Sequence, residues 1–231
     1  PSEGTEQGSS PETENSPTRT SRALVPGHMK GRQGEGVCTL VNDWVDRPFD
    51  GDISVDDTDM NTVVARHRKQ LFYHVPGESD IESGLDSMDE TGAFSDINYA
   101  DKSRTAWDPE YALQRISGFT RAYLADEHPL NGDSRLREAA TTALQYWIDQ
   151  DPTSDNWWFN EIGGPREMRD ILTIMVGEDR NWLADRPGLA GDAFEYLAQA
   201  ETRGTGANLL DLALIELVHA CLANKPALVR E

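Results

Sequence analysis

Three things are scarce in this sequence: cysteine, clustered positive charge and long apolar runs. With 2 cysteines far apart, Cys38 and Cys221, the chain has no disulfide framework, and Cys221 on an apolar segment is predicted to be a free buried thiol. No run of about 18 apolar residues occurs, which excludes a membrane-spanning helix. The 21 basic residues are outnumbered by 41 acidic ones and form no stripe, so nucleic acid is excluded as a partner.

Motifs for metals and cofactors are also missing. No Cys and His spacing indicates zinc, no glycine-rich loop indicates a phosphate site, and no Gly-x-Ser-x-Gly indicates an acyl hydrolase. The acidic run from Asp50 to Asp59 offers oxygen ligands, but its spacing differs from that of a calcium-binding loop. We therefore predict no metal and no cofactor, with calcium at the acidic run as the alternative.

The first part of the chain differs in composition from the rest. Residues 1–36 are rich in Ser, Thr, Pro, Glu and Gly, and we predict a disordered tail because they cannot bury enough apolar surface to offset the entropy of ordering. Residues 37–93 are predicted to be a lead-in with one helix near 57–73 and a long loop from 76 to 94. Residues 94–231 then form one predicted helical domain.

Within that domain, apolar residues recur at helical spacing. One helix is predicted to start at Asp108, because a capping residue there precedes a proline at the first helical position. The last three predicted helices cover residues near 165–177, 187–202 and 206–224. Helices joined by short connections, with no strand alternation after Ala100, predict an all-α fold of antiparallel helix hairpins.

The most unusual segment reads NWWFNEIG, from Asn156 to Gly163. Two adjacent indoles in a polar loop are difficult to bury together, because successive side chains point in different directions and each ring N–H needs a partner. We therefore predict that at least one ring, of Trp157 or Trp158, faces a ligand. The faces of sugar rings stack on indole, and the flanking polar side chains would hold the hydroxyls. The alternative is that the pair packs in a core or an interface.

The last predicted helix carries polar residues on one side. At 100° per residue, four of them share an arc of about 140°: Asn208, Asp211, Glu216 and His219. The remainder is apolar, so we predict that the helix is largely buried and that the polar arc faces a wet cleft. His219 itself is predicted to be a packed histidine. The alternative for Asn208 is a helix cap, because Gly206 begins the turn and Asn is favoured at caps.

Three blocks of the sequence resemble the family 8 polysaccharide lyases, which include hyaluronate, chondroitin AC and xanthan lyases. The blocks are FSDINYADKSRTAWDPEYALQRI from Phe94, NWWFNEIGGPREMRDILTIM from Asn156 and TGANLLDLALIELVHACLA from Thr205. They occur in the order that the family has, and they cover residues 94–224. The resemblance implies that the helix hairpins form part of an incomplete (α/α) toroid.

The resemblance also implies a reaction and a site. The reaction would be β-elimination on a uronic-acid-containing polysaccharide, which leaves a 4,5-unsaturated sugar. Asn208 would be the catalytic amide that stabilises the developing charge on the uronate. The substrate-binding residues would be Asn156, Trp157, Trp158, Glu161 and Arg166.

The formal charge of −20 opposes the binding of an acidic polysaccharide, so the cleft is expected to be locally positive. Four basic residues near the Trp segment or in the first block are the candidates for this role: Lys102, Arg104, Arg166 and Arg169. A solvated acidic surface without a role in binding is the other interpretation of the charge.

The resemblance further implies a secreted or periplasmic protein, although no signal peptide is visible in this sequence. The family's tyrosine and histidine, which act as base and acid, would come from sequence after Glu231, so we expect the missing C-terminal part of the lyase as a partner. Two alternatives stay open: a non-catalytic carbohydrate-binding remnant of the toroid, and a glycoside hydrolase on a related toroid with two carboxylates. Candidates for those carboxylates are Asp155, Glu161 and Asp211. The sequence does not identify the polysaccharide.

Overall fold

The computed structural model describes residues 56–177 and 180–225, which belong to one compact unit. The predictions for the tail at 1–36, for Cys38 and for the acidic run before residue 56 lie outside the described residues. The elements in chain order are α2 (Asp57–Leu71), α3 (Glu78–Asp86), α4 (Asp108–Leu124), α5 (Ser134–Gln150), the π-helix η1 (Phe159–Gly163), α6 (Gly164–Met175), β1 (Val176–Gly177), β2 (Arg180–Asn181), α7 (Pro187–Leu197) and α8 (Ala207–Leu222).

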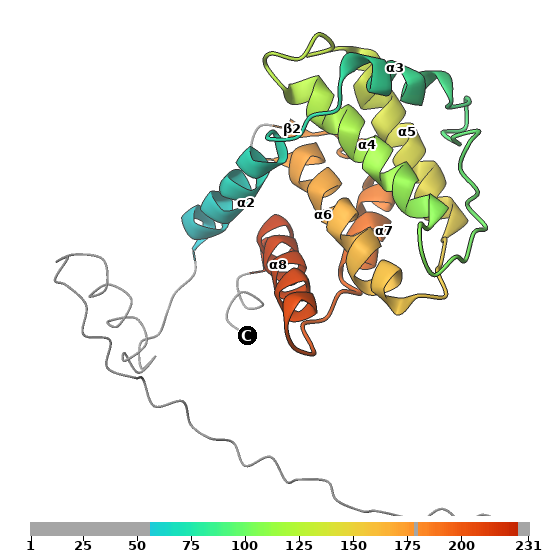
Figure 1. Cartoon of the computed structure of the whole chain (residues 1–231). Helices are drawn as coiled ribbons and strands as arrows, with labels where there is room; N and C mark the ends of the chain where they lie inside the picture. The colour runs from blue at the N-terminus through green and yellow to red at the C-terminus, as the bar shows by residue number, and fades with distance from the viewer. Residues whose placement is uncertain (1–55, 178–179, 226–231) are drawn as a thin grey trace, which may run out of the picture. The chain divides into compact units, whose positions relative to one another are not determined.

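Helices make up nearly all of the regular structure in the described ranges, which confirms the prediction of an all-α fold. The strands β1 and β2 are two residues each and pair antiparallel, with Val176 opposite Asn181. The helix α4 lies between α5 and α6 and packs on both, so it forms the centre of the core (Figure 1). Its apolar stripe, from Ala112 to Phe119, is fully buried, as the helical spacing predicts.

Two buried tryptophans fill this core, and each has its ring N–H satisfied. Trp107 donates to the carbonyl of Asp101 at 2.8 Å, and Trp147 donates to the carbonyl of Pro109 at 2.9 Å. The first bond joins the loop before α4 to Trp107, the cap of α4. The second joins α5 to the first turn of α4, where Pro109 lies. A buried indole with a bonded N–H contributes apolar area without the penalty of an unpaired polar group.

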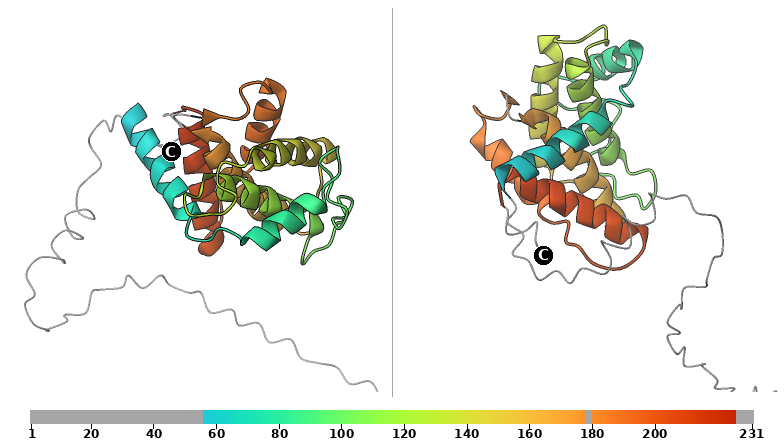
Figure 2. Two further views of the ribbon diagram at one scale, coloured as in Figure 1. Left: turned by 90° about the horizontal axis from the view of Figure 1, so that it is seen from above. Right: turned by 90° about the vertical axis from the view of Figure 1, so that its left-hand side faces the viewer.

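The helix α2 packs against α6 and α8, and Figure 2 shows it lying alongside α8. His67 in α2 is 8% exposed, and its Nε2 lies 2.9 Å from Oδ1 of Asp170 in α6. The same carboxylate accepts from Arg169 at 2.8 Å. Burial opposes ionisation of Asp170, but its bonds to His67 and Arg169 outweigh burial and lower its pKa. His67 is thus a packed histidine with a bonded ring nitrogen.

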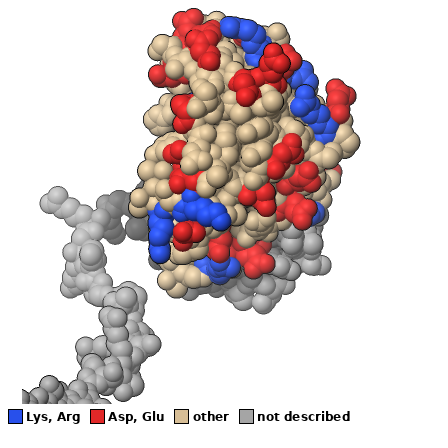
Figure 3. Space-filling model, turned by 90° about the vertical axis from the view of Figure 1, so that its right-hand side faces the viewer, with Lys and Arg blue, Asp and Glu red and all other residues tan. Residues whose placement is uncertain are grey.

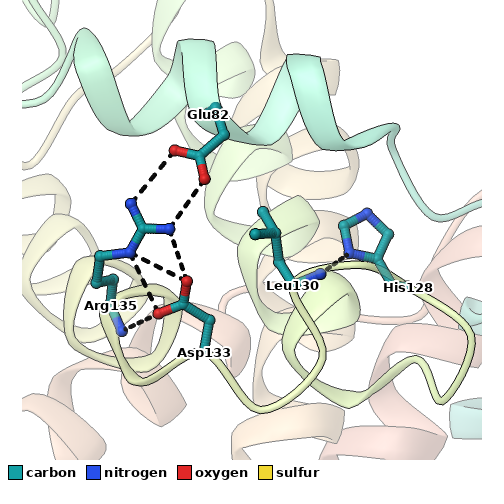
Figure 4. Close-up of polar contacts among 5 residues, drawn as sticks. All are labelled: Glu82, His128, Leu130, Asp133 and Arg135. Carbon is teal, nitrogen blue, oxygen red and sulfur yellow. Dashed lines mark hydrogen bonds and ion pairs between the residues drawn. The ribbon is translucent and has the colours of Figure 1, made fainter.

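The long loop predicted for residues 76–94 is wrong, because it contains α3. This helix buries Ile81 against the core, and a Cβ at Gly84 would lie only 3.0 Å from the ring of Phe119 in α4. The glycine that reads as a loop signal in sequence therefore permits close helix packing. α3 is also tied to the start of α5 by Arg135, which contacts Glu82 at 2.9 Å and Asp133 at 2.7 Å (Figure 4).

The partly buried histidine of the turn between α4 and α5 has partners that sequence analysis did not identify. His128 accepts at Nδ1 from the backbone N–H of Leu130 at 3.1 Å (Figure 4), and its Nε2 lies 3.0 Å from the carbonyl of Pro76. Cys221 is a free buried cysteine, as predicted. Within the described ranges no helix has both the length and the apolarity to cross a bilayer.

Candidate functional site

The tryptophan segment is helical, so the predicted loop is wrong at this point. The Asn156 side chain accepts from the backbone N–H of Trp158 at 3.1 Å, as a helix cap does, and η1 begins at Phe159. A π-helix turn is uncommon and occurs frequently at functional sites. The wider turn leads directly into α6 at Gly164, so both tryptophans lie at the start of a packed helix. Their positions are thereby fixed by the core.

The two indoles have different surroundings. Trp157 is 50% exposed, while Trp158 is half-buried. The ring of Trp158 packs edge-on against Phe159, at 5.3 Å between centroids, and the guanidinium of Arg166 lies 5.5 Å from its centroid. A rigid exposed indole beside a supported one is a surface on which sugar rings can stack. The expectation that both rings would not be buried together holds.

Hydrogen bonds attach the tryptophan segment to the loop before α4. Asn156 donates from Nδ2 to the carbonyl of Arg104 at 2.9 Å, and the N–H of Asp155 donates to the carbonyl of Lys102 at 3.0 Å. The hydroxyl of Ser154 donates to the carbonyl of Ser103 at 2.7 Å. The Asn156 amide thus makes two bonds inside the protein and keeps one N–H and one lone pair for a ligand.

Asn208 is the second residue of α8, and the cap at this end is Gly206, with no side-chain capping bond. The capping alternative for Asn208 is therefore wrong. Its side chain is half-exposed and makes no hydrogen bond to the described residues. Gly206 has φ of 71° with open space around it, a backbone conformation that favours glycine. An amide without a partner among the described residues, at an exposed helix start, is available to a ligand.

The polar arc predicted on α8 is only partly correct. His219 is 6% exposed and packs at 6.0 Å from the ring of Phe194, so it lies in the core, and burial lowers its pKa. Glu216 and Asp211 are half-buried. The prediction that the apolar side of the helix is largely buried also fails in part, because Leu210 is 73% and Leu214 40% exposed. α8 therefore carries an apolar strip that no described residue covers.

Glu161, predicted to bind sugar hydroxyls, pairs with Arg203 of the segment between α7 and α8. Thr202, next to Arg203, donates from its hydroxyl to a carboxylate oxygen of Glu216. The backbone N–H of Thr202 donates to the same oxygen at 3.3 Å. No local pattern in the sequence marks Thr202 or Arg203, because their partners lie 14 and 42 positions away.

The four basic residues expected in the cleft differ in burial and in the partners of their side chains. Arg169 is 5% exposed and bonded to Asp170, so its assignment to the cleft is wrong. Arg166 lies over Trp158 and 3.9 Å from Glu167. Lys102 and Arg104 are exposed and form no ion pair within the described ranges. Figure 3 shows one face of the molecule, on which acidic side chains are widespread and basic ones gather in small groups.

Two carboxyl groups lie near the start of α6, and no local pattern marks either of them. A Cβ at Gly163 would lie 2.8 Å from the Trp158 ring and 2.9 Å from Oε1 of Glu110, so the glycine allows this packing. Burial raises the pKa of Glu110, partly offset by Arg166. Burial and the nearby Asp170 raise the pKa of Glu167 to about 7.

This shift predicts a pH-dependent stability. A carboxyl whose pKa is raised in the folded state stabilises the fold while it is protonated, and that contribution is lost as the pH rises from about 4.5 through about 7. Glu167→Gln should therefore change the free energy of unfolding little at about pH 5 and increase it by about 2 kcal/mol at about pH 8. Denaturant titrations at both pH values measure this, with the exposed Glu138→Gln as control. Equal effects at both pH values would contradict it.

The residues that the structure describes contain no group of three or more His, Cys, Asp or Glu side chains arranged to hold a metal ion. In the described part of the acidic run, Asp56 and Asp59 form a capping box at the start of α2, with the side chain of Asp56 accepting at 3.0 Å. A helix cap therefore accounts for these two carboxylates without a cation.

The comparisons with known proteins agree on one family. The model of the polysaccharide lyase family 8 N-terminal alpha-helical domain matches residues 67–231. The chondroitinase-AC of Pedobacter heparinus is 30% identical over 149 residues, which make up 64% of this chain and 21% of that enzyme. A solved chondroitinase AC lyase, from a study of its oligosaccharide complexes, has a TM-score of 0.64 at 26% identity, over 74% of this chain and 25% of that one.

These matches decide the fold and the family. The chain spans about a fifth to a quarter of the length of these relatives. The likeness in structure, together with the all-α architecture, confirms that the helix hairpins are part of an incomplete (α/α) toroid. Because the family model covers most of the chain, including the tryptophan segment and α8, the chain belongs to polysaccharide lyase family 8.

Proposed function

We propose that this chain is the N-terminal helical part of a lyase that cleaves a uronic-acid-containing polysaccharide by β-elimination and leaves 4,5-unsaturated products. The observation that supports this most directly is the packing of η1 against α8, because it brings the turn that follows the exposed indole of Trp157 next to the helix that carries Asn208. The relatives are named as chondroitinase AC enzymes, and one was solved with oligosaccharides. An acidic polysaccharide is the substrate class that fits this family.

The reaction places specific demands on the site. A base removes the proton at C5 of the uronate, and the electron pair of the C5–H bond forms the C4=C5 double bond. The C4–O bond to the leaving sugar breaks, and the oxygen of that sugar takes up a proton from an acid. Negative charge develops on the carboxylate as the C5 proton leaves. The Asn208 amide donates a hydrogen bond to that carboxylate and stabilises the charge. Trp157 and Trp158 stack on neighbouring sugars and fix the register of the chain in the cleft.

The general base is expected from sequence beyond this chain. Among the described tyrosines, burial raises the pKa of Tyr99 to about 12, and it raises the pKa of Tyr196 still further. Neither ionises at neutral pH, so neither fits a base that must accept a proton from C5. We infer that a tyrosine and a histidine in the remainder of the lyase act as base and acid.

The apolar strip of α8 fits this division of the protein. Leu210 and Leu214 are exposed on the helix that carries Asn208, and large exposed apolar side chains in a row mark a surface that packs against something else. We propose that the remainder of the lyase covers this strip, which lies on the side of α8 away from Asn208. The family assignment also favours a secreted or periplasmic location, where such a polysaccharide is accessible.

The test is the absorbance of unsaturated uronate products. This chain, and the same chain together with the remainder of a family 8 lyase, are each incubated with chondroitin sulfate, hyaluronan and xanthan. Absorbance should rise only with the longer protein. Tryptophan fluorescence of the short chain should respond to oligosaccharides from the polysaccharide that is cleaved. A longer protein that folds and binds these polysaccharides without forming unsaturated products would overturn the proposal and favour a carbohydrate-binding module.

The charge of the substrate leads to a second expected result. Lys102 and Arg104 are exposed beside the tryptophan segment and have no ion-pair partner among the described residues, whereas Arg166 is already held by Trp158 and Glu167. Replacing both Lys102 and Arg104 by Gln should weaken binding of an acidic oligosaccharide about fivefold at low salt and less at high salt. Asp155→Asn, which removes the nearby acidic charge, should act in the opposite direction.

Fluorescence titration of the chain with chondroitin sulfate oligosaccharides at several salt concentrations measures these changes. A carboxyl-reduced, desulfated oligosaccharide serves as the uncharged control, and its affinity should not respond to these substitutions. An equal loss for charged and uncharged sugars would mean that the two residues shape the loop rather than supply charge.

A further inference from the structure

The segment 198–206 joins α7 to α8 and ends just before Asn208, and residues 201–206 are exposed. Gly204 and Gly206 have φ of 81° and 71°, with no atoms near the place of a Cβ. Ala200 is buried in the core, but residues 201–206 gain little from burial and lose much conformational freedom on ordering. Their position therefore depends on whatever side-chain contacts hold them.

Two side-chain contacts hold this segment, and both use carboxylates on other elements. Arg203 pairs with Glu161 in η1. Thr202 bonds to Glu216 in α8, through its hydroxyl and through its N–H at 3.3 Å. Glu161 lies three residues after Trp158, and Arg203 five residues before Asn208. The first anchor thus connects the tryptophan segment to the chain that leads into the Asn208 helix, and the second connects that chain to α8.

The path of the segment explains why anchoring is needed. Glu216 lies nine residues into α8 from Ala207, which is about 13 Å along the axis at 1.5 Å per residue. The segment therefore starts beside the middle of α8 and returns to its first turn through Gly204 and Gly206. Because α8 also packs directly on η1, loss of the anchors would loosen the segment that leads into the first turn of α8 rather than separate the two elements.

We propose that the Glu161–Arg203 ion pair, supported by the Thr202–Glu216 contact, is a positioning device. It sets the distance and orientation of the Asn208 amide relative to the indoles of Trp157 and Trp158, the tryptophan platform. This inference rests on the proposed lyase function. It replaces the sequence-based assignment of Glu161 as a sugar-binding residue. The side chain of Glu161 is 28% and that of Arg203 54% exposed, so the pair adds little to global stability. Its effect is geometric, because a misplacement of about 1 Å in a catalytic group can cost about 100-fold in rate.

The experiment uses the lyase that carries this domain, with kcat and KM measured from unsaturated-product formation on the polysaccharide that it cleaves. Glu161→Gln and Arg203→Gln should each lower kcat about 10-fold and change KM less than about twofold. The charge-swapped double variant, Glu161→Arg with Arg203→Glu, should recover most of kcat. Thr202→Val should give a smaller loss in the same direction. Thermal unfolding of the variants should stay close to that of the parent protein.

A matched control is the ion pair of Glu82 and Arg135, which is also exposed but ties α3 to the start of α5. Glu82→Gln should leave kcat and KM unchanged. If Glu161 binds substrate directly, Glu161→Gln raises KM and the charge swap gives no recovery, and the inference is overturned. Unchanged kcat in all Glu161 and Arg203 variants overturns it too, while Asn208→Ala in the same assay shows separately whether the proposed function holds.

Discussion

Asn208→Ala is expected to lower the kcat of the lyase that carries this domain by about 100- to 1000-fold, the usual cost of removing one donor that stabilises a developing negative charge. The amide is half-exposed at the second position of α8 and has no bond to the described residues, so its removal leaves none of their polar groups unpaired. The affinity for substrate should change far less, because the tryptophan platform is untouched.

Single-turnover formation of unsaturated product measures the chemical step, and tryptophan fluorescence measures binding. Asn61→Ala, at an exposed asparagine of α2, is the control and should change neither. Asn208→Asp separates size from chemistry, because it keeps the shape but places a second negative charge near the uronate; we expect a loss at least as large as that of Asn208→Ala. Full activity in Asn208→Ala would rule out its assigned role.

Gly164→Ala is expected to destabilise the fold by about 3 kcal/mol, at the start of the helix that follows the tryptophan segment. The backbone of Gly164 is right-handed helical, with φ of −61° and ψ of −52°, so alanine is compatible with the backbone. The added Cβ, however, would overlap the hydroxyl of Tyr196 and lie 3.1 Å from the carbonyl of Phe159. Tyr196 packs edge-on against the fully buried Trp147, at 5.0 Å between ring centroids, and this contact resists withdrawal of its ring on that side.

Tyr196→Phe tests this cause directly. The Tyr196 hydroxyl is buried without a hydrogen-bond partner among the described residues, so its removal should by itself increase stability by about 1 kcal/mol. In the Gly164→Ala background the same change should restore at least half of the lost stability, because it removes the overlapping oxygen. Gly191→Ala in α7, where nothing lies near the added Cβ, is the control and should be neutral or stabilising. Denaturant unfolding of the four proteins measures the coupling, and simple additivity would refute this explanation.

The helices with a strong apolar period were predictable from local sequence. The helix α4 begins at Asp108 as predicted, but its cap is Trp107, without a side-chain capping bond, so the predicted cap at Asp108 is wrong. The helices α6 and α8 lie within a few residues of the predicted ranges. α3 escapes prediction because its only deeply buried apolar residue is Ile81 and its glycine reads as a loop signal. The predicted helix at 187–202 ends at Leu197, since the chain there turns into the anchored segment that leads to α8.

The residue types of the candidate site were predictable from the sequence, but the partners of their side chains were not. Two adjacent tryptophans cannot both be buried easily, and this local fact correctly indicates an exposed ring, found at Trp157. Glu161, Arg166 and Arg169 are candidates for substrate binding by sequence because they are charged and close to the tryptophans. Each has a partner from elsewhere in space or along its own helix, in Arg203, Glu167 and Asp170.

By itself, the sequence determined the helical class, the family and the chemistry that the exposed residues can offer, because periodicity and a run of unusual side chains are local properties. Only the tertiary structure decided which charges are already paired, which carboxyl is buried enough to have a raised pKa, and which contacts the segment before Asn208 makes. Those outcomes depend on pairs such as Glu161 with Arg203 and His67 with Asp170, which lie 42 and 103 residues apart. The energy of a charge is set by the groups that folding brings beside it, and no local pattern records them.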